Sequence, residues 1–160
     1  MSVGWRDIAF QIESPLAEEA MAAWTWLFPE QWTPLVCSMV GGIFVQTANE
    51  LVHWLDTGTG LIEQVSDSRE QFEATLRSNS RLMDEWFLPG LVEQLHDAGK
   101  CAGLGQCYAF TILPIFAEGR YAPENMFVAP VREQIIGMAN IHQQLSAVPD
   151  GSTVRIEVTD

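Results

Sequence analysis

A tight turn at Asp56-Thr57-Gly58-Thr59-Gly60, set between stretches of alternating residues, places the strongest constraint on the fold. From Leu35 to Val65 the side chains alternate in character with a period of two, which is typical of β-strands. The Asp56 carboxylate can bond the turn backbone, and a glycine supplies the positive φ that a tight reversal needs. We therefore predict an antiparallel hairpin in which Gly58 or Gly60 has a positive φ.

Three strands are expected in this region, with connections at residues 47–50 and 56–60. The middle segment, residues 51–56, is largely apolar on both faces, so it belongs in the centre of a sheet or is covered on its second face. Further strands are expected at residues 106–113 and 125–128. An alternating segment at residues 154–158, after a turn at 149–151, predicts a last strand.

Helix signals occupy the remaining segments of the chain. Ser14-Pro15 predicts the start of a helix, and Pro29 predicts its end. Ser68–Gln71 has the spacing of a capping box at the start of another helix. A helical stretch at residues 80–98 is interrupted at Pro89-Gly90, and another spans residues 131–147. The pattern predicts one α+β domain over residues 1–160, with an antiparallel sheet of about five or six strands and helices packed against it.

The charge is strongly acidic, with 21 Asp and Glu residues against eight Lys and Arg residues and a net charge of −13. Such a chain repels nucleic acids and anionic membrane surfaces, so we expect neither as a partner, and its field attracts basic proteins. On charge alone, acidity that serves solubility is the more common explanation. No apolar run reaches the length of a membrane span, and the first residues do not form a signal peptide.

Three cysteines, Cys37, Cys101 and Cys107, form an odd set without the spacing of a disulfide framework. We interpret them as reduced thiols, which indicates a cytoplasmic protein. None lies in a basic setting that would lower its pKa, and no nucleophile, phosphate-loop or dinucleotide motif is present. The sequence therefore predicts no catalytic residue and no cofactor.

Two histidines, His53 and His142, are candidate functional groups. His53 and Asp56 are three residues apart on a strand, so their side chains are expected on opposite faces. Asp56 is therefore expected to cap the turn. His53, which lies between two leucines, is expected to be half-buried and hydrogen-bonded. His142 lies on the apolar stripe of the last helix, so we predict that it is buried, hydrogen-bonded and free of metal.

A series of motifs along the chain resembles a known family. The motifs are Trp26-Leu27-Phe28-Pro29, Gly42-Ile43-Phe44, His53–Gly60, Asp67-Ser68…Phe72, Gly105-Gln106-Cys107-Tyr108, Tyr121…Glu124-Asn125, Ile141-His142…Gln144 and Pro149-Asp150-Gly151. Together they resemble the C-terminal domain of the immunity proteins of type VI secretion DNase effectors, over roughly residues 20–155. The resemblance implies a non-enzymatic protein that binds a basic nuclease or nuclease-like toxin and protects its own cell.

Five residues of these motifs are candidates for partner binding, namely His53, Asp56, Tyr121, Glu124 and Asn125. For Glu124 and Asn125, bracing of their loop is the default expectation. The alternative function is a small-molecule-binding protein or hydrolase with a pocket around His53, Tyr121, Glu124 and His142. Convergence of these side chains on one cavity would favour that alternative, and their dispersal would favour the binding protein. The oligomeric state is left open.

Overall fold

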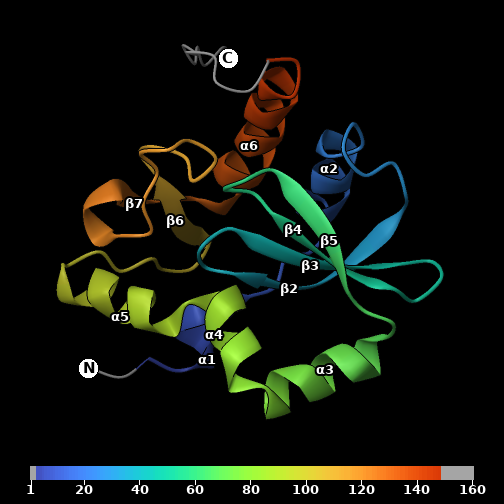
Figure 1. The fold of residues 1–160 in the computed structure, drawn as a ribbon, viewed down its shortest axis with the longest axis horizontal. Helices are drawn as coiled ribbons and strands as arrows, with labels where there is room; N and C mark the ends of the chain where they lie inside the picture. The colour runs from blue at the N-terminus through green and yellow to red at the C-terminus, as the bar shows by residue number, and fades with distance from the viewer. Residues whose placement is uncertain (1–2, 149–160) are drawn as a thin grey trace.

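The computed structural model describes residues 3–148, in which helices surround two antiparallel sheets (Figure 1). The larger sheet has the order β1-β2-β3-β4-β5. Its strands are β1 (Ala9–Phe10), β2 (Trp32–Ser38), β3 (Gly42–Thr47), β4 (Val52–Asp56) and β5 (Leu61–Ser66). The smaller sheet pairs β6 (Gln106–Phe110) with β7 (Met126–Pro130). The predicted α+β fold with an antiparallel sheet is therefore confirmed.

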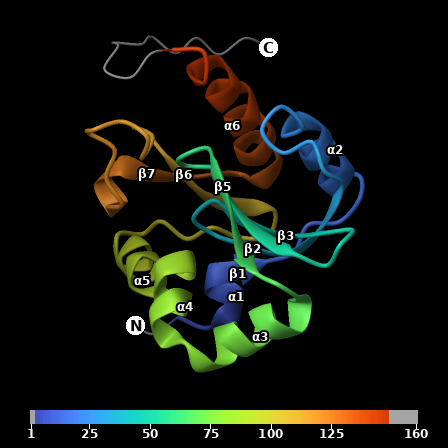
Figure 2. The ribbon, with the colours of Figure 1, turned by 45° about the vertical axis from the view of Figure 1, so that its right-hand side comes forward.

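Six α-helices and one short 3₁₀ helix belong to the described residues. They are α1 (Trp5–Ile8), α2 (Leu16–Ala23), α3 (Arg69–Ser78), α4 (Ser80–Phe87), α5 (Pro89–Asp97), α6 (Val131–Leu145) and the 3₁₀ helix η1 (Pro123–Asn125). Helices α2 and α6 lie on one side of the larger sheet, and α3 and α4 lie on the other (Figures 1 and 2). No helix among the described residues is both long and apolar enough to span a membrane.

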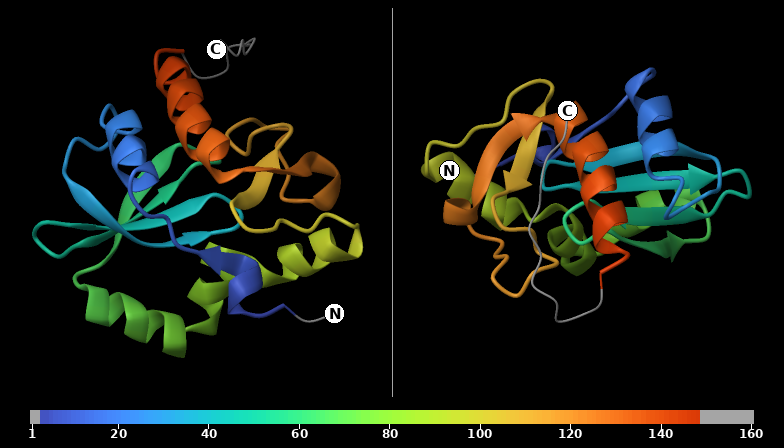
Figure 3. Two further views of the ribbon diagram at one scale, coloured as in Figure 1. Left: turned by 180° about the vertical axis from the view of Figure 1, so that it is seen from behind. Right: turned by 90° about the horizontal axis from the view of Figure 1, so that it is seen from above.

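Strand β4 lies between β3 and β5, so the predicted central position of residues 51–56 is confirmed. In the β3–β4 register Gly42 faces Asp56 and Phe44 faces Trp54. Both faces of β3 are buried, because helices cover the sheet from both sides (Figure 3). The adjacent residues Ile43 and Phe44, which point to opposite faces, are accordingly both inaccessible to solvent.

The second sheet was not predicted as a separate unit. The strands expected at residues 106–113 and 125–128 pair only with each other among the described strands. At the N-terminus, α1 and the two-residue β1 were also missed, because elements this short carry no readable periodicity. The strand predicted at residues 154–158 and the turn at 149–151 lie outside the described residues.

The helix ends require three corrections to the predictions. Ser14 does not cap α2: Pro15 occupies the N-cap position, and no side chain caps the helix. The helix also ends at Ala23 rather than near Pro29, and turns occupy residues 24–27. Ser68 caps α3 as predicted, because its Oγ accepts from Gln71 N at 3.1 Å. The Gln71 side chain, however, accepts from Asp67 N rather than from Ser68 N.

The predicted break at Pro89 is confirmed. Leu88 adopts a left-handed conformation with φ +47°, which ends α4, and Pro89 begins α5. Gly99 follows α5 with φ +80°, as expected for a glycine just past a helix C-terminus. The break directly follows Trp86 and Phe87, whose rings pack on Phe44 of the larger sheet.

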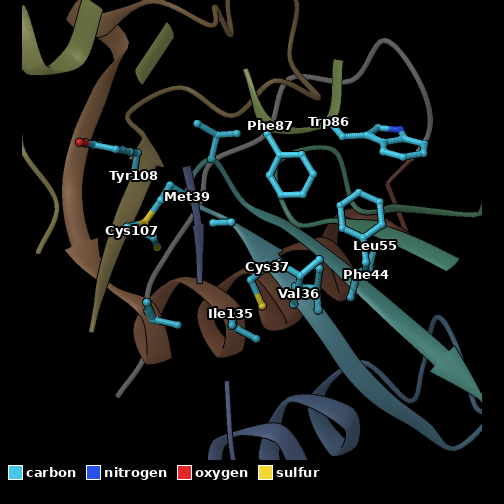
Figure 4. Packing of buried hydrophobic residues seen from close by; sticks show 14 of the residues in the cluster. Val36, Cys37, Met39, Phe44, Leu55, Trp86, Phe87, Cys107, Tyr108 and Ile135 are labelled. Atoms are coloured by element: carbon cyan, nitrogen blue, oxygen red, sulfur yellow. The ribbon is translucent and has the colours of Figure 1, made fainter. Parts of the chain in front are cut away.

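An aromatic cluster forms the core between the sheet and α4 (Figure 4). Phe44 of β3 is completely buried, with its ring 4.8 Å from Phe72, 5.2 Å from Trp86 and 5.6 Å from Phe87. On the other face of the sheet, Trp24 Nε1 donates to the Ile135 carbonyl at 3.1 Å, which ties the end of α2 to α6. The two layers of helices are thus anchored through aromatic side chains.

Candidate functional site

A cavity of about 220 Å³ lies beside the end of β4. Its apolar and backbone lining comes from Val40, Gly42 and Leu88, and Ser38 contributes a hydroxyl. The residues that give it chemical character are three aromatic side chains and two carboxylates, namely Trp54, Trp86, Tyr121, Asp56 and Glu85. We call these five residues the acidic aromatic cavity. Two predicted partner-binding residues, Asp56 and Tyr121, are therefore brought together although they are far apart in sequence.

Asp56 holds the turn as predicted. Its Oδ1 accepts from Gly58 N at 2.9 Å, and its Oδ2 accepts from Thr59 Oγ1 at 3.0 Å. Gly60 has φ +72° and donates its N–H to the Asp56 carbonyl at 2.8 Å, which confirms the predicted positive φ. Burial raises the pKa of the Asp56 carboxyl, and the turn hydrogen bonds oppose that rise. No Lys or Arg within residues 3–148 forms an ion pair with it.

Trp54 lies two residues before Asp56, so both side chains project from the same face of β4. Trp86 approaches from α4, with its ring centroid 6.5 Å from that of Trp54 and an interplanar angle of 53°. A Cβ at Gly42 would lie 2.6 Å from Trp54 Nε1, so a glycine is needed for the indole to occupy this place. Trp54 Nε1 is itself buried and has no hydrogen-bond partner among the described residues.

Tyr121 closes the cavity from the loop before η1. Its ring packs edge-on against Phe110 at 5.1 Å, and the residue remains 45% exposed. Burial of the phenol and the nearby Asp56 carboxylate raise the pKa of Tyr121 to about 12. At neutral pH the phenol is therefore uncharged and can donate a hydrogen bond. Glu85 is more exposed and pairs with Arg81 at 3.5 Å along α4.

His53 lies away from this cavity. Its ring packs against Phe28 with 4.8 Å between centroids, whereas Asp56 lines the cavity. The side chains of His53 and Asp56 therefore lie on opposite faces of β4, as predicted. Burial lowers the pKa of His53, and the nearby Glu30 opposes that shift. The expectation that His53 is hydrogen-bonded is wrong for Nδ1, which is buried without a partner within residues 3–148. The aromatic neighbour offers this nitrogen no acceptor or donor.

Asn125 and Glu124 also lie outside the acidic aromatic cavity. The Asn125 side chain accepts from Ile112 N and donates to Ile112 O, both at 2.9 Å, and it donates to Arg120 O at 2.8 Å. It braces the loop between β6 and β7, as the default expectation had it. Glu124 is solvent-exposed on η1. Sequence proximity to Tyr121 therefore did not bring these side chains to the same place.

His142 of α6 contacts the turn at residues 56–60. The side chain is 3% exposed, and its Nε2 lies 2.8 Å from the Thr57 carbonyl, so the prediction of a buried, hydrogen-bonded imidazole is confirmed. Because a carbonyl can only accept, Nε2 carries the proton. Gln134 of the same helix donates to Thr57 Oγ1 at 3.4 Å. Within the described chain no three His, Cys, Asp or Glu side chains are grouped so that they could hold a metal ion.

Burial lowers the pKa of His142, although the Thr57 carbonyl and Asp56 oppose the shift. The unfolded chain, with a pKa of about 6.5, therefore binds a proton at residue 142 before the folded chain does. The free energy of unfolding should therefore fall as the pH drops from 7 through the unfolded pKa of about 6.5 and on toward the lower pKa of the folded protein. Urea titrations should show a smaller fall for His142→Gln, whose amide can still donate to Thr57. Identical pH slopes would contradict this expectation.

The three cysteines are free thiols, in agreement with the prediction. Burial raises the pKa of Cys37 and Cys107, so neither is a thiolate at neutral pH. Neither a protein-family model nor a curated protein sequence matches the chain. The resemblance to the immunity-protein family therefore stays a prediction.

Sequence reasoning missed three members of the acidic aromatic cavity, Trp54, Glu85 and Trp86. A signal existed for Trp54, because it precedes Asp56 by two residues on one strand and must share its face. No comparable signal existed for Glu85 and Trp86. They reach the cavity because the end of α4 packs against the sheet, where the Trp86 ring lies beside Phe44 and Trp54.

Proposed function

We propose that this protein is a cytoplasmic, non-enzymatic immunity protein that neutralises a basic nuclease-type toxin by binding it through an acidic surface. The observation that carries the proposal is that the acidic excess stays uncompensated after folding. Within residues 3–148 the ion pairs are Arg69–Glu73, Arg81–Glu85 and Arg132–Glu19. Most of the carboxylates in this part of the chain therefore have no basic partner.

The lone lysine of the chain does not offset this charge at the surface. Lys100 Nζ donates to the carbonyls of Pro123 at 2.6 Å and Met126 at 2.8 Å, so it serves to join α5 to η1 and β7. Three exposed carboxylates that form no ion pair within the described residues, Glu70, Asp84 and Asp97, occur on the consecutive helices α3, α4 and α5, of which α3 and α4 also carry the exposed Arg69, Arg77 and Arg81. We call the three acidic residues the acidic helical face, and Figure 1 shows the helices that carry it along one side of the molecule.

A nuclease must present basic side chains to the phosphates of its substrate. A protein that offers carboxylates can occupy the same basic cleft and exclude DNA, and opposite charges accelerate the encounter. The dispersal of the residues named for the rival pocket supports this choice over a hydrolase. Tyr121 lines the acidic aromatic cavity, whereas His53 packs on Phe28, Glu124 is exposed and His142 bonds the turn.

The partner search begins with the product of any adjacent gene that encodes a candidate nuclease. The test adds the protein to a DNA-cleavage assay of that nuclease domain, and cleavage is expected to stop at stoichiometric amounts. Turnover of a small substrate by the isolated protein, abolished by His53→Gln or Glu124→Gln, would instead support the hydrolase.

Association with such a toxin is expected to slow about tenfold or more between low and high salt, whereas dissociation should change less. Neutralising the acidic helical face with Glu70→Gln, Asp84→Asn and Asp97→Asn should lower the on-rate at low salt, compared with the unmodified protein. The matched control, Glu13→Gln, Glu30→Gln and Glu133→Gln, removes the same charge around α2 and α6. Stopped-flow measurements separate the two sets.

A smaller decrease in the on-rate for the control set than for the acidic helical face is expected if location matters. Equal decreases would show that only the net charge steers association. A salt-independent on-rate for the unmodified protein would contradict the electrostatic basis of the proposal.

A further inference from the structure

The acidic aromatic cavity combines groups that recognise organic cations. Trp54 and Trp86 come from β4 and α4, and Tyr121 comes from the loop that precedes η1. Aromatic faces attract a cation through their quadrupoles, and the attraction grows when the site is shielded from water. Carboxylates of Asp56 and Glu85 line the same cavity. No lysine or arginine is among the residues that line it.

Asp56 is the member of the cavity that most needs a positive partner. Its turn bonds come from Gly58 N and from the hydroxyl and the backbone N–H of Thr59, and an ionised carboxylate has about four acceptor sites, so one acceptor site remains. The charged form is disfavoured by burial. The titratable groups that interact with Asp56 are His142, held neutral by burial, and the phenol of Tyr121. Neither supplies a positive charge at neutral pH.

The size of the cavity restricts its occupant. A volume of about 220 Å³ is smaller than the 300–1,000 Å³ or so of typical small-molecule pockets. It suits the end of one side chain better than a nucleotide or a cofactor. Among basic side chains, arginine has a planar guanidinium that stacks on aromatic rings and also bonds carboxylates in a fork.

We propose that this cavity is a receptor for the guanidinium of one arginine side chain of a partner protein. The guanidinium stacks among Trp54, Trp86 and Tyr121 and donates to the Asp56 carboxylate. The identity of the partner rests on the proposed toxin binding, but the receptor itself is testable without any toxin. It would give the interface one anchor side chain, and a few such anchors carry most of the binding free energy of tight interfaces.

The direct test uses capped amino acids as probes, N-acetyl-arginine methylamide against N-acetyl-citrulline methylamide. The citrulline side chain has nearly the same shape but carries no charge. Titration followed by NMR chemical shifts should show saturable binding of the arginine probe at least about tenfold tighter than that of the citrulline probe. The shifted resonances should include the indole N–H groups of Trp54 and Trp86.

Matched variants locate the site. Asp56→Asn should weaken arginine binding about tenfold, whereas Glu124→Gln, which removes one charge nearby but outside the cavity, should leave it unchanged. Because Asp56 also caps the turn, Tyr121→Leu serves as a second variant on a partly exposed side chain and should weaken binding too. Thermal unfolding confirms that each variant is folded. Equal affinity for the two probes, or equal weakening by Glu124→Gln, overturns the proposal.

The outcomes for the two proposals are distinguishable. Binding of the arginine probe without inhibition of any nuclease would support the receptor and contradict the immunity function. Tight toxin binding that Asp56→Asn and Tyr121→Leu leave unchanged would support the immunity function and overturn the receptor.

Discussion

Replacing Phe44 with alanine is expected to lower the free energy of unfolding by about 3–5 kcal/mol. The side chain is fully buried and lies at the centre of the aromatic cluster, within 4.8–5.6 Å of the ring centroids of Phe72, Trp86 and Phe87. Alanine would lose the transfer free energy of the ring and leave a void between β3 and α4. Urea or guanidinium titration of the purified variant measures the loss.

The same substitution at Phe127 is the control. Phe127 lies on β7 and is 46% exposed, so Phe127→Ala removes little buried area and should cost about 1 kcal/mol or less. A loss below about 1 kcal/mol for Phe44→Ala would mean that the cluster is loosely packed or collapses around the void. Trp86, which lines the acidic aromatic cavity, should also be displaced, and a shift of its indole N–H resonance in NMR spectra would report that change.

Alanine at Gly60 is expected to destabilise the protein by about 3 kcal/mol, which is more than backbone strain alone would cost. Gly60 has φ +72°, a conformation that costs about 1–2 kcal/mol for a residue with a side chain. A Cβ there would also lie 2.6 Å from Cγ and Nδ1 of His142. The ring cannot withdraw without losing its bond to the Thr57 carbonyl.

Gly105 separates the two contributions. It has φ +75°, and nothing lies within 4 Å of the Cβ that alanine would add, so Gly105→Ala carries the backbone strain alone. We expect a loss of about 1–2 kcal/mol there, with the remaining loss at Gly60 due to contact with His142. Combining Gly60→Ala with His142→Ala should cost less than the sum of the single changes. Equal losses for Gly60→Ala and Gly105→Ala would refute the contact.

Local features of the amino-acid sequence determined much of the backbone. The Asp56 carboxylate and Gly60 act within the few residues of the turn, so the capping role of Asp56 and the positive φ of Gly60 were predictable and are confirmed, whereas Gly58 does not have a positive φ. Apolar side chains on both faces of residues 51–56 indicated a central strand, and the ring of Pro89 required a helix break. The position of His142 on an apolar stripe predicted its burial. Each of these conclusions depends on interactions of near neighbours or on periodicity.

Only the tertiary structure decided which of the candidate side chains lie together in one site. Sequence spacing did not indicate that β6 and β7 form their own sheet, since pairing is a contact between distant segments. The acidic aromatic cavity depends on the same kind of contact. Asp56 and Tyr121 meet because β4, α4 and the loop before η1 converge, and His53 is turned away by the alternation of the strand. Side-chain packing among these elements, rather than any local pattern, left Asp56 half-buried in a cavity that aromatic side chains also line, and no Lys or Arg within residues 3–148 forms an ion pair with it.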